Sequence, residues 1–173
     1  MKLTLILIFI TFSFYCCSQS NKAETVISKD NFTIEYPKPW RLDTSKIMGT
    51  EFIAFSPLED SADKFSENVN VIIQNLSGQN IDLEKYKQIT EQQITTIMTD
   101  GKVFESSIVK TNKNNYFKIV YAMTQNERRL KFISVCFIKD DKAYLATFTC
   151  ELDKYDSYKK IGEEILNSFS LTN

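Results

Sequence analysis

The stretch RRLKFISVCFIKDDKAYLATFTC, residues 128–150, decides the fold, because it predicts a β-hairpin that is apolar on both faces. Asp140 and Asp141 interrupt two extended runs and are typical turn residues. Side chains alternate along a strand, so each run presents one set of residues to each face. A sheet with two apolar faces needs a covering layer on each side. The first run places Ile133, Val135 and Phe137 on one face and Phe132, Cys136 and Ile138 on the other.

This hairpin ends a predicted antiparallel meander of four strands. The separators at 111–115 and 125–127 are short and rich in turn-forming residues, which favours hairpin connections. The meander strands are expected at 102–109, 116–124, 128–139 and 142–150, and three shorter strands are expected before them at 31–36, 51–56 and 69–76.

Two helices are predicted as the covering layers. Residues 82–98 carry apolar side chains at helical spacing, with Asn80 or Asp82 as the N-cap and Gly101 just past the end. Residues 155–169 carry a second apolar stripe, on which Gly162 would allow a close approach to the sheet. The predicted fold class is therefore α/β (α+β), a three-layer α/β/α sandwich around a mainly antiparallel sheet.

Composition limits the function as well as the fold. The chain has 173 residues, which suits one domain, and its formal net charge of −1 argues against a broadly basic nucleic-acid binder. It has no histidine, which excludes Ser-His and Cys-His catalysis and histidine-containing metal sites. No nucleophile motif, P-loop or dinucleotide fingerprint is present, so we expect no enzyme activity and no cofactor.

The N-terminus has the pattern of an export signal. Lys2 precedes an apolar run at residues 3–15, which is shorter than the roughly 20 residues that a membrane-spanning helix needs. Cys17 follows with Cys16 at position −1 and Phe14 at −3, a pattern similar to a bacterial lipobox. We expect a signal peptide at 1–16, lipidation of Cys17, a tether at 17–29 and one domain at 30–173; a plain secreted protein is the alternative.

The two remaining cysteines are predicted to stay reduced. If the hairpin turns at Asp140 and Asp141, Cys136 lies opposite Leu145 and Cys150 lies opposite Lys131, on the other face of the sheet. A disulfide requires Cα atoms within about 7 Å. We therefore expect two free, mostly buried thiols.

Several local strings carry a family resemblance. They are FTIEYPKPW at 32–40, ENVNV at 67–71 and KDDKAY at 139–144, together with the helix that ends at Ser168 and Phe169. In this order they resemble the PsbP-like (Mog/PsbP-type) α/β/α sandwiches, in a bacterial lipoprotein version. That group includes the extrinsic oxygen-evolving subunit of photosystem II and a yeast Ran-binding import factor. The resemblance implies a binding or assembly module, and we do not carry over the photosynthetic role.

Four acidic residues are the weak candidates for a metal site. Glu59, Asp60, Asp63 and Glu67 could offer oxygen ligands to Ca²⁺ or Mn²⁺. Their spacing lacks the alternating pattern of a calcium loop, and Leu58, Ala62 and Phe65 interrupt them. We therefore favour a solvated surface loop and predict no metal.

Aromatic and basic residues are the candidates for a partner or ligand surface. Tyr36 and Trp40 could line a recognition groove, although a buried staple after the first strand is the favoured interpretation. Arg128 and Arg129 could dock an anionic partner or could simply protect a strand edge.

The sequence predicts a membrane-tethered, non-enzymatic binding or assembly module that faces an extracytoplasmic space of a bacterium. Its expected partners are the membrane, through the lipid, and a protein of unknown identity, with no nucleic acid. The alternative is a carrier of a small ligand, lipid or metal ion that uses a pocket between the sheet and a helix.

Overall fold

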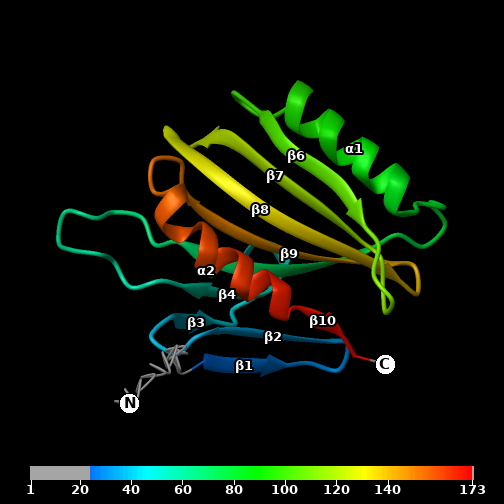
Figure 1. Ribbon diagram of the computed structural model, residues 1–173, viewed down its shortest axis with the longest axis horizontal. Coiled ribbons are helices and arrows are strands. Elements are labelled where there is room, and N and C mark those ends of the chain that lie inside the picture. The colour runs from blue at the N-terminus through cyan, green and yellow to red at the C-terminus, as the bar shows by residue number, and fades with distance from the viewer. Residues whose placement is uncertain (1–23, 173) are drawn as a thin grey trace, which may run out of the picture.

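The computed structural model describes residues 24–172, which form two β-sheets and two α-helices (Figure 1). The elements are β1 (Glu24–Ser28), β2 (Phe32–Pro37), β3 (Arg41–Asp43), a 3-10 turn (Ile47–Gly49), β4 (Thr50–Phe55), β5 (Asn68–Asn75), α1 (Leu83–Thr96), β6 (Lys102–Val109), β7 (Tyr116–Gln125), β8 (Arg128–Lys139), β9 (Lys142–Glu151), α2 (Tyr155–Ser168) and β10 (Ser170–Leu171).

The larger sheet contains the predicted meander. Its strand order is β3-β4-β5-β9-β8-β7-β6, and every neighbouring pair is antiparallel. The strands β6 to β9 follow one another through short turns, while β5 pairs with β9 and so joins the meander to the earlier strands. None of the helices in residues 24–172 is long and apolar enough to cross a bilayer.

The register of the last hairpin confirms the prediction for the cysteines. Cys136 lies opposite Leu145, and Cys150 lies opposite Lys131. Both thiols are free and buried. Burial raises the pKa of each thiol to about 12, so neither is a nucleophile near neutral pH.

The two helices cover opposite faces of this sheet, as the apolar pattern predicts. Ile94 of α1 packs with Phe117, Ile119 and Cys136 on one face. On the other face, Leu166 of α2 packs in a separate and larger cluster, whose members from β8 are Ile133, Val135 and Phe137. The three-layer architecture is therefore confirmed.

The N-terminal part of the fold differs from the prediction in two respects. The first expected strand, now β2, does not join the central sheet but forms a second sheet of order β1-β2-β10. Residues 24–28, which the sequence placed in the tether, form β1 and pair with β2. An edge strand can be mostly polar because only one side needs to be buried, and here Ile27 alone packs against the core.

The small sheet lies on the same side of the molecule as α2 (Figure 1). Phe32 and Ile34 of β2 are fully buried in the cluster that α2 also covers. The Ser168 hydroxyl accepts a hydrogen bond from the Glu35 amide at 2.8 Å, which joins the end of α2 to β2. The larger core is thus enclosed by the central sheet, α2 and the small sheet.

Candidate functional site

Tyr36 and Trp40 do not form a surface. Tyr36 is 4% exposed and Trp40 is 7% exposed, and both belong to the core under α2. The Trp40 ring centroid lies 6.5 Å from that of Phe148 on β9. The turn after β2 therefore places an aromatic anchor in the core. This agrees with the favoured interpretation, a buried staple, and corrects the alternative of a recognition groove.

Arg128 and Arg129 are held by separate partners at the start of β8. Arg128 Nη1 donates to Glu151 Oε1 at 2.6 Å, and Arg129 Nη1 donates to the Asp100 carbonyl at 2.6 Å. The nearby Lys131 Nζ lies 3.5 Å from the ring centroid of Tyr155. These cations tie β8 to neighbouring elements, and the structure does not join the two arginines in one basic site.

The acidic residues lie in the long loop between β4 and β5, where Lys154 supplies the cation. Lys154 Nζ lies 3.1 Å from Glu59 Oε2, 3.2 Å from Asp63 Oδ2 and 4.0 Å from Glu151 Oε2. These residues line a hollow of about 360 Å³ at the surface, together with Asp60 and Arg128. Lys154 precedes α2, so its ammonium fastens the loop to the β9–α2 junction.

Backbone amides of the same loop donate hydrogen bonds to the carboxylates of Asp60 and Asp63. Asp60 Oδ1 accepts from the amides of Ala62 and Asp63, and Asp63 accepts from the amides of Glu59 and Phe65. The amides of Glu59 and Phe65, helped by Lys154, lower the pKa of Asp63 to about 2. This pattern is that of a loop that organises itself around its own carboxylates.

Glu67 differs from the other three acidic residues because it is fully buried. The Ser56 hydroxyl donates to Glu67 Oε2 at 3.2 Å, whereas Glu67 Oε1 has no partner among the described groups. Burial raises the pKa of this carboxyl. Within residues 24–172 no group of three or more Asp, Glu, Cys or His side chains is arranged to hold a metal ion.

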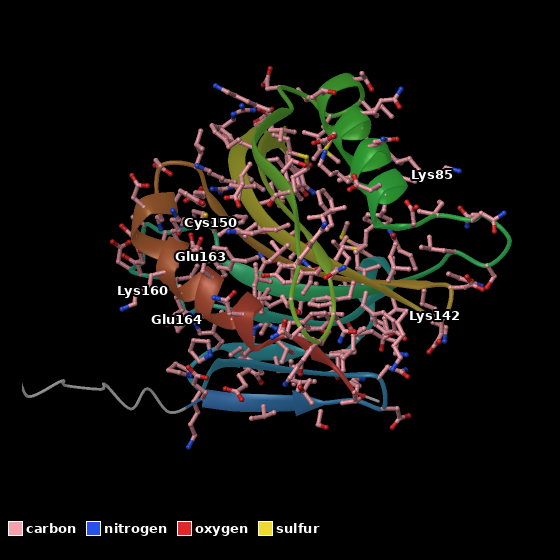
Figure 2. The ribbon with its side chains drawn as sticks, turned by 45° about the vertical axis from the view of Figure 1, so that its right-hand side comes forward. Lys85, Lys142, Cys150, Lys160, Glu163 and Glu164 are labelled. Carbon is pink, nitrogen blue, oxygen red and sulfur yellow. The ribbon has the colours of Figure 1, made fainter. Side chains whose placement is uncertain are left out.

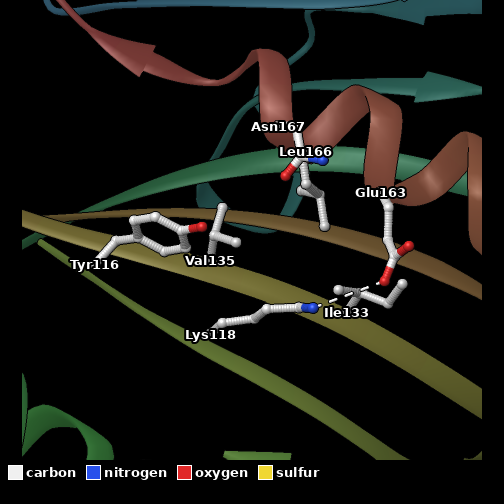
Figure 3. A pocket seen from close by; sticks show the side chains of 7 residues that line it. All are labelled: Tyr116, Lys118, Ile133, Val135, Glu163, Leu166 and Asn167. Atoms are coloured by element: carbon white, nitrogen blue, oxygen red, sulfur yellow. Dashed lines mark ion pairs between the residues drawn. The ribbon is translucent and has the colours of Figure 1, made fainter. Parts of the chain in front are cut away.

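A second pocket lies between α2 and the central sheet, at residues that the sequence did not single out (Figure 3). Its volume is about 210 Å³. Its apolar lining, called the floor below, comes from the sheet and from the helix. Ile133 and Val135 lie on β8, and Leu166 lies on α2. The polar lining consists of Tyr116 and Lys118 from β7 and Glu163 and Asn167 from α2.

Strand alternation and helix packing position these polar groups. Lys118 lies opposite Val135 in the register of β7 and β8, so it belongs to the face that α2 covers. The Tyr116 ring stacks on Phe137 with centroids 5.0 Å apart. Lys118 Nζ lies 3.4 Å from Glu105 Oε1 and 3.7 Å from Glu163 Oε1, so it spans from β6 to α2.

The pocket gathers polar groups of four kinds next to apolar side chains. These are a cation, a carboxylate, an amide and a phenol, beside the almost fully buried side chains of Ile133, Val135 and Leu166. Alternating polar residues on β7 were visible in the sequence, but their meeting with Glu163 depends on how α2 crosses the sheet. No sequence pattern could have revealed that meeting.

The fold is that of an α/β/α sandwich with a central antiparallel sheet. The model of the PsbP family matches residues 24–171, and the chain belongs to that family. A search of curated proteins finds no relative in sequence.

Solved structures show the same fold at low sequence identity. The cyanobacterial PsbP protein of Synechocystis is 14% identical with a TM-score of 0.65, and the match covers 91% of this chain and 97% of that one. LpqN of Mycobacterium tuberculosis, described as involved in cell envelope biogenesis, is 13% identical with a TM-score of 0.59, covering 87% and 91%. The protein PA94 of Pseudomonas aeruginosa is 10% identical with a TM-score of 0.57, covering 82% and 92%.

Proposed function

We propose that this protein is a lipid-anchored, non-enzymatic binding or assembly module on the extracytoplasmic face of a bacterial membrane. The observation that carries the proposal is the close spacing of the lipobox-like Cys17 and the first strand, since β1 begins at Glu24. The six residues between them can span only about 3.3–3.6 Å each, or roughly 20 Å in total. A lipid on Cys17 would therefore hold the small sheet close to the membrane.

The fold is compatible with that orientation. β1 lies at one end of the molecule in Figure 1, and α1 and β6 lie at the opposite end. A module anchored through β1 would present α1 and β6 away from the lipid surface. Membership of the PsbP family and the similarity to LpqN, which is described as involved in cell envelope biogenesis, support this role.

Metabolic labelling tests the anchor. We expect cells fed a palmitate analogue to label the wild-type protein, and the Cys17→Ser variant to lose the label and leave the membrane fraction. Cys16→Ser is the matched control and should keep the label, because a small residue at −1 suits the lipobox. Equal labelling of wild type and Cys17→Ser would disprove lipidation at that residue.

Crosslinking in membranes tests the binding role. A photo-crosslinker placed at the exposed Ile97, which follows the last residue of α1, should give a reproducible adduct with one partner, and one placed at Val26 of β1 should react mainly with lipid. Turnover in an activity screen, with no adduct at either position, would contradict the proposal.

A carrier of a small ligand is the second candidate function. The observation that favours it is the pocket of about 210 Å³ between α2 and the sheet, which is where the sequence places such a site. A carrier must bind its ligand as an isolated protein, whereas an assembly module needs its partner. Calorimetry on the purified chain with small ligands therefore separates the two functions.

A further inference from the structure

The pocket under α2 presents opposite charges side by side over an apolar floor. Figure 3 shows Glu163 reaching down from α2 toward the end of the Lys118 side chain, with Tyr116 at the other side of the pocket. Asn167, one helical turn from Glu163, contributes an amide that can donate or accept. The floor residues Ile133 and Leu166 are 1% and 4% exposed.

The charged groups of the pocket form only long ion pairs with each other and keep hydrogen-bonding capacity for a ligand. Lys118 Nζ lies 3.7 Å from Glu163 and 3.4 Å from Glu105, whereas charge-assisted hydrogen bonds are about 2.7–2.9 Å long. Among the described residues, the side chains of Lys118, Glu163 and Asn167 make no hydrogen bond to another protein group. Long, partly exposed ion pairs contribute little to stability, so a ligand can insert between them at low cost.

Both signs of charge restrict the chemistry of the ligand. A simple anion at Lys118 would face repulsion from Glu105 and Glu163, and a simple cation at Glu163 would face Lys118. A molecule that carries both charges can place each beside its opposite. The volume of about 210 Å³ lies below the ~300–1,000 Å³ of typical ligand pockets, which limits such a molecule to a small one such as valine or leucine.

We propose that the pocket between α2 and the central sheet binds a small zwitterion of the α-amino acid class with an apolar side chain. This inference rests on the carrier function proposed above and names its ligand class. Lys118 and Asn167 bind the carboxylate, and Glu163 binds the ammonium. The aliphatic side chain lies over Ile133, Val135 and Leu166.

Titration calorimetry on the purified full chain tests the ligand class. L-leucine should give saturable binding, and two analogues that each lack one charge, isoamylamine and 4-methylpentanoate, should bind at least about tenfold more weakly, because each leaves one pocket charge without a partner. No saturable heat with leucine or valine would overturn the proposal.

Variants locate the site. Lys118→Met and Glu163→Gln should each weaken leucine binding by about tenfold or more. Lys160→Met and Glu164→Gln, both on α2, make the same two changes outside the pocket and are the matched controls, since this exposed ion pair of 3.8 Å points away from the sheet (Figure 2). Binding by both pocket variants at wild-type strength would overturn the assignment. Asn167→Leu changes an exposed residue, so it tests the pocket even if Lys118→Met fails to fold.

A thermal-shift screen distinguishes the failure of this inference from the failure of the carrier function. If fatty acids, sugars or nucleosides stabilise the wild type and not the Asn167→Leu variant, the carrier function holds and the amino-acid class is wrong. If no small molecule of any class stabilises the wild type, both are wrong, while the anchored module is still tested by labelling and crosslinking.

Discussion

Gly162 lies on the face of α2 that contacts β9, where the Phe148 ring fills the space that a Cβ atom would need. A Cβ built on Gly162 would come within 2.4 Å of the Phe148 ring, which is itself fully buried. The glycine therefore sets how closely α2 approaches the sheet. This spacing also sets the depth of the pocket, because Glu163 and Leu166 follow on the same helix.

Replacing Gly162 tests this close approach. Gly162→Ala should lower the free energy of unfolding by about 1–3 kcal/mol through overpacking, even though alanine is the better helix former. Urea denaturation followed by circular dichroism measures the change. Lys160→Ala, at a position that is largely exposed on the same helix, should be neutral within about 0.5 kcal/mol. A stabilised Gly162→Ala variant would contradict the predicted clash.

Asp63 gives the loop between β4 and β5 a pH dependence of defined sign. Its pKa falls from 3.8 unfolded to about 2 in the fold, so its contribution to stability is present above pH 4 and is lost as the pH falls toward 2. Asp63→Asn should destabilise the protein at pH 6, and the difference from wild type should shrink between pH 4 and pH 2. Denaturation midpoints measured across this range check it. Glu164→Gln, at an exposed helix position, should show no such convergence with wild type.

Individual elements are fixed by local chemistry at their ends. The last hairpin turns at Asp140 and Asp141, whose φ angles of 50° and 54° suit a two-residue turn between strands. Because that turn fixes the register, it decides which cysteine lies on which face. Helix α1 begins one residue later than expected, at Leu83, and the Asp82 carboxylate accepts from the Lys85 amide at 2.8 Å. Of the two expected caps, the structure uses Asp82.

The cap of α1 can be tested directly. Asp82→Ala should cost about 0.5–2 kcal/mol of stability because it leaves the Lys85 amide without its acceptor, and Asp82→Asn should recover most of the loss. Chemical denaturation measures both variants. Lys85→Ala keeps the backbone donor and serves as the control. Equal stability of Asp82→Ala and wild type would show that the cap contributes nothing.

At the scale of the whole molecule, the small sheet closes the larger core. Phe32 of β2 lies against Phe169 at the end of α2, with ring centroids 5.5 Å apart. β10 then pairs with β2, so the C-terminal segment joins strands formed near the N-terminus. β1 covers the other edge of β2 through five residue pairs.

Removal of β1 tests its place in the folded domain. A chain that begins at Asp30 should melt a few degrees lower than one that begins at Ala23, at the ~2–4 °C per kcal/mol expected for a domain of this size, because β2 loses one of its two partner strands and Ile27 leaves the core. It should also self-associate, since an exposed strand edge invites pairing. Calorimetry and light scattering measure the two effects. Identical melting would show that residues 24–28 act only as a tether.

Most of the central layer could be predicted from the sequence because its signals are local. The turn chemistry at Asp140 and Asp141, the two-faced hairpin and the apolar stripe of α2 each depend on residues close together in the chain. The strand β1 escaped prediction because an edge strand needs little apolar character. The acidic loop was found, but its cation was not, since Lys154 lies 91 residues from Asp63.

The sequence by itself determined the composition limits, the meander, its two covering helices and the separation of the two thiols, because periodicity and turn geometry are short-range properties. Only the tertiary structure decided that Trp40 is buried, that β2 belongs to a second sheet and that Lys118 meets Glu163 under α2. Those outcomes depend on how elements distant in the chain pack, which is governed by side-chain volume and close approach, as at Gly162.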